Sequence, residues 1–283
     1  MPQNRRAFLE NLAASTAGWA LATGANPGVV PAAAKQSQAR TIPVALIQCD
    51  SVAGEIKRNL DNMERLTEQA AKAGARWIMF HELTLCDYAD KPEMVAETVP
   101  QGATTRRMAK LAQRLRVFCA FGLAEKHGDR LYDSQVFVGP KGYLYHYRKT
   151  WLWLEPKDDG FRDEWARYDP GTGPEIFRLD GVRATCFICA DGDSRRCHDR
   201  AAALKPQVVF FPNNRQSLPS FEDFGKIAAR IGAPMLVANR VGRSVIYDCK
   251  GGCAVFSAQG EVLAKANREG REEILQYELQ LPA

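Results

Sequence analysis

Ala184-Thr185-Cys186-Phe187-Ile188-Cys189-Ala190-Asp191 is the stretch on which the fold and the chemistry of this chain depend. Its first five residues are apolar or small and predict a buried strand. The strand runs into Cys189, and the small Ala190 followed by Asp191 indicates a tight turn into a helix. A thiol exposed at such a strand end can act as a nucleophile, with the N–H of Ala190 available to a developing oxyanion.

Two other predicted strands end in residues that complement a thiol. The apolar run 77–80 leads to Glu82, and the run 144–147 leads to Lys149. A carboxylate can act as a general base and an ammonium can stabilise an oxyanion. Each of these residues stands at the end of its own predicted strand. They therefore form a plausible base (Glu82), oxyanion partner (Lys149) and nucleophile (Cys189).

The rest of the chain alternates strand and helix patterns. We expect strands at 42–49, 77–82, 117–124, 182–188, 208–211 and 235–238, helices at 59–74, 104–116 and 221–231, and hairpins at 134–147 and 253–266. This alternation predicts an α/β sheet with helices on its outer faces. The segment 154–173 is long and rich in charge, Pro and Gly, which is typical of a functional or disordered loop. No internal linker or repeat is visible, so residues 35–283 are expected to form one domain.

The first residues differ in composition from the remainder. Asn4-Arg5-Arg6 is similar to a twin-arginine export motif, a weakly apolar stretch follows at 12–24, and 31–34 offers an Ala-x-Ala cleavage site. This order predicts a signal peptide over residues 1–34, the twin-arginine translocase as a partner, and a periplasmic or otherwise exported protein. The alternative is an Ala-rich helix with two solvated arginines.

Charge and cysteine content exclude several classes of function. The net charge of +5 is diffuse along the 283 residues, so no basic stripe for nucleic acid is present. No apolar run reaches the roughly 18 residues of a membrane span. The eight cysteines leave the redox state open, with Cys249 and Cys253 as the pair favoured by proximity. The four histidines are scattered and no CxxC pair accompanies them, which disfavours a zinc site.

Taken together, these segments resemble the carbon–nitrogen hydrolase (nitrilase) superfamily, in its amidase and carbamoylase branch. The resemblance rests on the order and spacing of four segments, 70–82, 133–149, 187–191 and 211–214. It implies a four-layer α-β-β-α sandwich and a Glu-Lys-Cys triad of Glu82, Lys149 and Cys189. It also implies hydrolysis of a small non-peptide amide or N-carbamoyl compound through a cysteine thioester, without a metal or organic cofactor.

The resemblance assigns further roles. Glu164 stands where many members place a second glutamate that orients the lysine or the substrate amide. Trp151 and Asn214 fall at positions that often face the substrate, although either can equally be a packing or turn residue. Members associate through helices near the nucleophile, so a homodimer or larger assembly is expected.

The chain also departs from the family pattern. His81 stands where a proline is common, and Gly192 and Asp193 stand where some carbamoylases have an arginine for a substrate carboxylate. Asp193 favours a cationic or neutral substrate or, more simply, caps a helix. The rival functions are a nitrilase with the same triad, an acyl transferase, and a catalytically silent binding module. The acyltransferase relatives carry a membrane domain that has no counterpart here.

Overall fold

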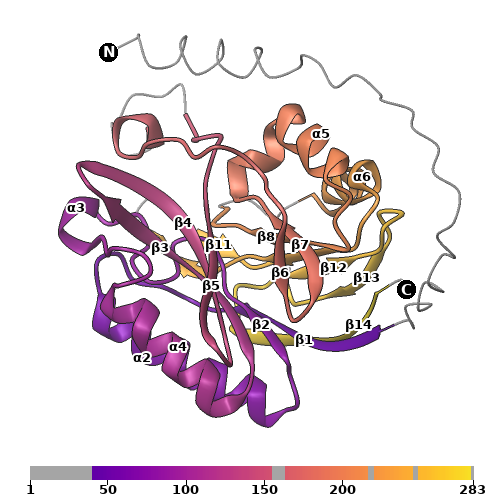
Figure 1. The fold of residues 1–283 in the computed structure, drawn as a ribbon, viewed down its shortest axis with the longest axis horizontal. Coiled ribbons are helices and arrows are strands. Elements are labelled where there is room, and N and C mark those ends of the chain that lie inside the picture. The colour runs from indigo at the N-terminus through magenta and orange to yellow at the C-terminus, as the bar shows by residue number, and fades with distance from the viewer. Residues whose placement is uncertain (1–39, 155–162, 216–219, 245–247, 282–283) are drawn as a thin grey trace, which may run out of the picture. The chain divides into compact units, whose positions relative to one another are not determined.

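Two six-stranded sheets pack face to face, with helices on the outer face of each (Figure 1). The computed structural model describes residues 40–154, 163–215, 220–244 and 248–281. These residues all belong to one unit, Gln38–Ala283. The predicted signal peptide and residues 155–162 of the predicted loop lie outside the described residues. The expected four-layer α-β-β-α arrangement is confirmed.

The first sheet is mixed, in the order β14-β1-β2-β3-β4-β5. The β1–β2 and β2–β3 pairs are parallel and the others antiparallel. Its strands are β1 (Arg40–Gln48), β2 (Trp77–Met79), β3 (Phe118–His127), β4 (Arg130–Gly139), β5 (Gly142–Arg148) and β14 (Glu273–Leu281), and its helices are α2 (Ile56–Lys72), α3 (Pro92–Val95) and α4 (Ala103–Leu115).

The second sheet repeats this plan in the order β13-β12-β9-β8-β7-β6, with parallel β7–β8 and β8–β9 pairs. Its strands are β6 (Phe177–Leu179), β7 (Val182–Cys186), β8 (Val208–Pro212), β9 (Met235–Ala238), β12 (Ala254–Phe256) and β13 (Val262–Lys265). Its helices are α5 (Arg195–Ala203) and α6 (Phe221–Ile231). A separate two-stranded sheet joins β10 (Val241–Arg243) to β11 (Asp248–Lys250).

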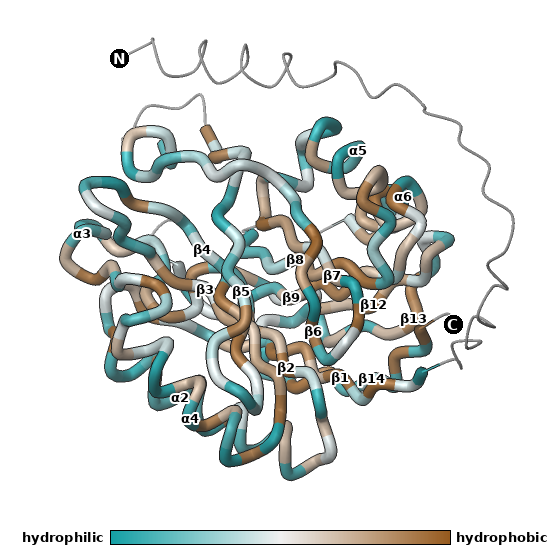
Figure 2. Tube along the Cα trace, in the orientation of Figure 1, coloured by the Kyte–Doolittle hydropathy of each residue, from teal (hydrophilic) through white to brown (hydrophobic). Residues whose placement is uncertain are grey.

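Strand β1 shows why this sequence forms a sheet that is covered on both faces. Its residues alternate between two hydrophobic clusters: Val44 and Leu46 join the core between the sheets, whereas Ala45 and Ile47 join the core under α2 and α4. Successive side chains of a strand point to opposite faces, so a strand that is apolar at every position must be covered on both. Figure 2 shows the result, because β1 is brown over much of its length whereas α2 and α4 alternate between teal and brown.

Most expected elements are confirmed, and the principal omission is β14. This strand pairs antiparallel with β1 along its whole length, from Arg40 opposite Leu281 to Gln48 opposite Glu273. It is an edge strand with Glu and Gln on its open face, so its apolar content is diluted. Its partner lies more than two hundred residues away in the sequence, and local periodicity carries no information about that pairing.

The sequence left the redox state of the cysteines open, and in the structure all eight are free thiols, including the Cys249 and Cys253 that proximity favoured as a pair. Cys249 lies in β11 with its sulfur 4.0 Å from Asn214 Oδ1, whereas the Cys253 sulfur accepts the backbone N–H of Asn239 at 3.2 Å. The strand pairing of β11 therefore holds the two thiols against different neighbours. None of the described helices has the length and apolar character needed to cross a membrane.

Candidate active site

Three of the predicted site residues meet around one buried ammonium group. Lys149 directly follows β5, and its Nζ lies 2.5 Å from Glu82 Oε1 and 2.7 Å from Glu164 Oε1. Glu82 follows β2, and Glu164 opens the short 3-10 helix η1 (Glu164–Ala166). The three side chains are almost completely excluded from solvent. A buried lysine between two carboxylates is held by charge-assisted hydrogen bonds, which are stronger than neutral ones.

The turn that carries Glu82 lies against the backbone of β3. A Cβ atom on Gly122 would lie 2.2 Å from the backbone nitrogen of Leu83, so only glycine permits this approach. Gly122 in turn accepts the N–H of Leu85 through its carbonyl oxygen at 3.0 Å. The glycine therefore sets where the Glu82 carboxylate stands relative to Lys149.

Cys189 stands at the predicted strand end, where β7 gives way to the 3-10 helix η2 (Cys189–Asp193). Its φ of +40° is unusual for a residue with a side chain, as expected of a sharp turn. Ala190 follows in the first turn of η2, where a helix leaves backbone N–H groups unpaired. Gly192 allows the turn to close against Phe211, whose Cζ would lie 2.4 Å from an added Cβ.

Asp191 links the turn that carries Cys189 to the segment that carries Lys149. Its carboxylate accepts the N–H of Ile188 at 2.9 Å, the N–H of Trp151 at 2.6 Å and the hydroxyl of Tyr147 at 2.8 Å. The side chain is completely buried in η2, which follows a strand of the second sheet, whereas Tyr147 lies in β5 of the first sheet and Trp151 lies just after it. The sequence predicted only a turn at Asp191, although a carboxylate among apolar residues two places after the thiol indicates a buried role.

The electrostatics keep the Cys189 sulfur as a thiol with a base beside it. Burial, and next the Glu82 carboxylate, raise the pKa of Cys189, while Arg215 and Lys149 oppose the shift. Burial alone would raise the pKa of Glu82, but the Lys149 ammonium and hydrogen bonds from neighbours that include the Cys189 thiol lower it overall. The carboxylate is thus ionised beside the thiol, and the electrostatics of Cys189 include Glu82, Lys149 and Glu164, so all four predicted polar side chains come together.

Arg215 is a second cation near the thiol, and sequence reasoning missed it. Its Nη2 donates to the backbone carbonyl of Cys189 at 2.7 Å and to the Asp193 carboxylate at 3.1 Å, while its Nε donates to Asn213 Oδ1 at 2.9 Å. The positive charge opposes the rise in the pKa of the Cys189 thiol more than Lys149 does. No pattern marked Arg215, because it lies past the end of β8 and reaches Cys189 only through the fold.

Asp133 was also missed as a site residue. It lies within β4, and its Oδ2 is 3.5 Å from Lys149 Nζ. Oxygen atoms of Glu82, Asp133 and Glu164 lie within 4.8 Å of one another, a grouping that can hold a metal ion. Here the Lys149 ammonium lies among them and supplies the positive charge. The sequence feature that could have identified Asp133 is an acidic residue inside an otherwise buried strand.

The remaining candidates have other partners. The Asn214 amide donates to Asp87 Oδ1 at 2.9 Å inside the protein, a contact that favours the packing alternative. Trp151 is half-buried and contributes its backbone N–H to Asp191. The expected helix cap at Asp193 is wrong: Ser194 is the N-cap of α5, and Asp193 pairs with Arg215.

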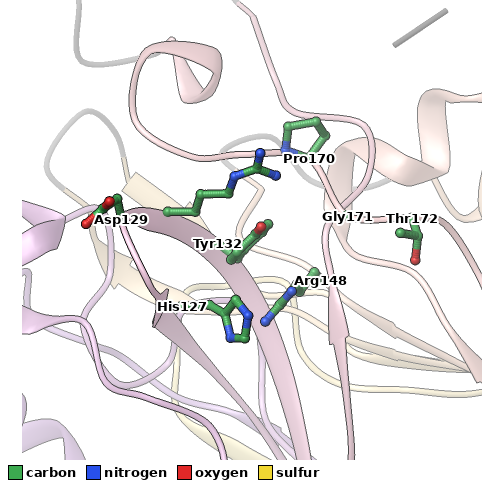
Figure 3. A pocket seen from close by; sticks show the side chains of 8 residues that line it. His127, Asp129, Tyr132, Arg148, Pro170, Gly171 and Thr172 are labelled. Atoms are coloured by element: carbon green, nitrogen blue, oxygen red, sulfur yellow. The ribbon is translucent and has the colours of Figure 1, made fainter. Parts of the chain in front are cut away.

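A separate cavity of about 600 Å³ lies beside the sheet edge and contains none of these residues (Figure 3). Its lining includes His127, Tyr132 and Arg148 from the strands and Pro170 from the following loop. Arg148 precedes Lys149, and successive strand residues point to opposite faces, so the two cations serve different sides of the sheet. The Arg148 guanidinium pairs with Glu125 and lies 4.0 Å from the centre of the Tyr132 ring.

The fold and the buried Glu-Lys-Glu-Cys group define a class of α/β enzymes built on paired sheets. Residues 43–283 match the carbon-nitrogen hydrolase family, and the chain belongs to that family. It is 28% identical over 250 residues to a nitrilase of Pyrococcus abyssi, covering 85% of this chain and 90% of the relative. It is also 28% identical over 209 residues to an (R)-stereoselective amidase of a Pseudomonas species, covering 71% and 73%.

A solved structure agrees on the fold. A mutant of the amidase from Nesterenkonia sp. AN1, with the acetamide moiety of fluoroacetamide added covalently at its active site cysteine, superposes with a TM-score of 0.73. The match covers 89% of this chain and 93% of the amidase at 19% identity. At that identity the likeness establishes the architecture of two mixed sheets flanked by helices.

Proposed function

We propose that the chain hydrolyses the carbon–nitrogen bond of a small non-peptide amide or N-carbamoyl compound, with Cys189 as nucleophile. The observation that carries this proposal is the buried Glu82 carboxylate, which lies 2.5 Å from the Lys149 ammonium and near enough to the Cys189 thiol for its charge to raise the pKa of that thiol. A thiol needs a base because the thiolate is the reactive form. The amidase relative and the amide adduct of the solved amidase support an amide substrate.

The first half of the reaction forms a thioester. Glu82 takes the thiol proton as the Cys189 sulfur attacks the carbonyl carbon, giving a tetrahedral oxyanion. Lys149 Nζ and the Ala190 N–H stabilise that oxyanion. The carbon–nitrogen bond then breaks, the protonated Glu82 gives its proton to the leaving nitrogen, and ammonia or an amine departs.

The second half restores the enzyme. Glu82 takes a proton from a water molecule, the resulting hydroxide attacks the thioester, and the carbon–sulfur bond breaks. The thiolate recovers its proton and the acid leaves. Glu164 holds the Lys149 ammonium at 2.7 Å through both steps, so the cation stays where the oxyanion forms.

The size of the substrate is limited by the closed site, since Cys189 is only 8% exposed. We assign Trp151 to the wall of the substrate pocket, since it follows Lys149 by two residues and remains half-buried. Asp193 is neutralised by Arg215, so it provides no free charge to select a cationic substrate. A neutral amide or carbamoyl group is therefore the class we favour.

The second candidate is a nitrilase, which the Pyrococcus relative favours. The same thiolate would add to the nitrile carbon and release acid and ammonia. The two functions differ in their starting material, so the test is ammonia release from a matched panel of amides, carbamoyl compounds and nitriles. Release that disappears in Cys189→Ala but persists in Cys119→Ala, a thiol of the outer core, supports thiol catalysis.

The same panel also tests the binding-module alternative. The best panel member identifies the substrate class, and an amide optimum excludes the nitrilase reading. No release from any member, together with a Cys189 that iodoacetamide does not alkylate at neutral pH, would overturn the enzyme proposal in favour of a binding module.

We also propose export and self-association, as the resemblance implies. Residues 1–34 would direct the folded chain to the twin-arginine translocase and hence to the periplasm. Replacing both Arg5 and Arg6 with Lys should retain the protein in the cytoplasmic fraction; continued export would contradict the assignment. Sedimentation of residues 35–283 tests a homodimer or larger assembly.

A further inference from the structure

Three buried carboxyl groups surround one lysine in the site. Glu82, Asp133 and Glu164 are each at most 2% exposed, and their oxygens lie within 4.8 Å of one another. If all three were ionised, Lys149 would leave two negative charges uncompensated in a space closed to water. Like charges at this separation in a low dielectric repel strongly, and such groups keep a proton instead. At least one carboxyl must therefore be neutral.

The Glu164 carboxylate accepts hydrogen bonds from three donors, which stabilise its ionised form. Its Oε1 accepts Lys149 Nζ at 2.7 Å and the Tyr88 hydroxyl at 2.9 Å, and its Oε2 accepts the backbone N–H of Trp153 at 2.6 Å. Three donors to one carboxylate stabilise its charged form. Burial raises the pKa of Glu164, but the Lys149 ammonium and the hydrogen bond from Trp153 oppose that shift, so Glu164 is a poorer place for the proton than a carboxyl without donors.

Asp133 has no such support. Among the described residues neither of its oxygens has a hydrogen-bond donor, and Lys149 Nζ lies at 3.5 Å. The second oxygen of Glu82, Oε2, is also buried without a donor. A buried acceptor left without a donor is destabilising, because it has lost its hydrogen bonds to water. A single proton shared between Asp133 and Glu82 Oε2 forms a hydrogen bond that gives both carboxyl groups the partner they lack.

We propose that Asp133 is a neutral carboxylic acid at neutral pH whose O–H donates to Glu82 Oε2 and so holds the Glu82 carboxylate toward the Cys189 thiol. Asp133 is then a positioning residue that acts through Glu82. The proposal rests on the proposed function, in which Glu82 is the base. Burial, followed by the Glu82 charge, raises the pKa of Asp133 well above its usual range, in agreement with the geometry.

Among the described residues, the largest charges acting on Asp133 are those of Glu82, Lys149 and Glu164. The titratable groups that face it from neighbouring elements are Glu82, Cys86, Lys149, Glu164, Tyr168 and Cys186. Burial raises the pKa values of the two thiols and of the phenol, so these groups stay neutral. Of these groups, the two glutamates and the lysine carry the charges that act on the proton of Asp133.

Infrared spectroscopy of the resting protein tests the protonation directly. At about pH 8, where Asp191 with its pKa of about 6 is ionised, we expect a carboxylic acid C=O band. The band should shift in D2O and on ¹³C-labelling of aspartate but not of glutamate, and it should be lost in Asp133→Asn. Absence of an aspartate band, or its persistence in Asp133→Asn, would overturn the proposal. This test needs no substrate, so it stands apart from the test of amidase activity.

Kinetics test the positioning role. Asn retains the shape and an N–H donor to Glu82, so Asp133→Asn should lower kcat less than about tenfold, whereas Asp133→Ala should lower it about 100-fold with KM little changed. Loss of the proton donor should also slow alkylation of Cys189 by iodoacetamide in Asp133→Ala more than in Asp133→Asn. Equal losses in the two variants would assign Asp133 a merely structural role.

Discussion

The Asp191 carboxylate accepts the backbone N–H of Trp151 at 2.6 Å, a contact between the turn after β7 and the segment after β5. The two residues follow strands of different sheets, and each lies two positions from a site residue, Cys189 and Lys149 respectively. The hydrogen bond thus sets the position of the thiol relative to the ammonium. Distance errors of about 1 Å in such an arrangement can cost about 100-fold in rate.

Asp191→Ala should therefore damage both stability and turnover. Three donors, the N–H groups of Ile188 and Trp151 and the Tyr147 hydroxyl, would lose their acceptor, so we expect a loss of about 3 kcal/mol in unfolding free energy. We expect kcat to fall about 100-fold. Urea unfolding and steady-state ammonia release measure the two effects. An unchanged kcat in a folded variant would show that the contact does not align the site.

Lys149→Met should be destabilising as well as inactive. It leaves the carboxylates of Glu82 and Glu164 buried without their shared cation, and breaking a buried pair costs about 3–5 kcal/mol. Ammonia release should fall by about 1,000-fold, because an oxyanion donor is lost. Lys110→Met, at an exposed position of α4, is the matched control and should change neither quantity. Comparable stability of the two variants would contradict the buried charge assignment.

Arg215→Leu should make the Cys189 thiol less reactive. The guanidinium opposes the rise in the pKa of Cys189, so its removal raises that pKa further and lowers the thiolate fraction about tenfold per pKa unit. The alkylation rate of Arg215→Lys should lie between those of the wild type and Arg215→Leu, because an ammonium cannot reach the Cys189 carbonyl and Asn213 together. The iodoacetamide rate at Cys189, followed by peptide mass spectrometry, measures this. Arg196→Leu, at an exposed position of α5, should match the wild type.

His81 should make the fold sensitive to acid. Burial, together with the Arg240 charge, lowers the pKa of His81 from 6.5 to about 3, and its Nδ1 lies 2.8 Å from the Glu82 carbonyl oxygen. Because the folded pKa is depressed, the stabilisation is complete above pH 6.5 and is lost as the pH falls toward 3. Between about pH 6.5 and 4 this amounts to about 3 kcal/mol.

The acid sensitivity can be isolated by substitution. The dependence of unfolding free energy on pH, measured with urea, should be shallower in His81→Gln than in the wild type over that range. His127→Gln, at an exposed position, serves as the control and should leave the curve of the wild type unchanged. Parallel curves for wild type and His81→Gln would contradict the assignment of a buried neutral imidazole.

By itself the sequence determined the order of strands and helices and the residues that end the strands. Periodicity of apolar residues is a local property, so α6 and β9 have the predicted bounds. Cys189 directly follows an apolar run, and Glu82 and Lys149 each stand one residue beyond one, so all three lie at strand ends that local patterns predict. The resemblance to the nitrilase superfamily then distinguished Glu82 from His81 and Lys149 from Arg148.

Only the tertiary structure decided what surrounds these residues. Asp133, Asp191 and Arg215 act on groups that are distant in sequence or belong to the opposite sheet, and nothing in their own segments specifies those partners. The ionisation of the site is decided in the same way, because a pKa depends on burial and on charges a few ångströms away in space. Packing of one sheet on the other brings those charges together, and that packing is a property of the whole chain.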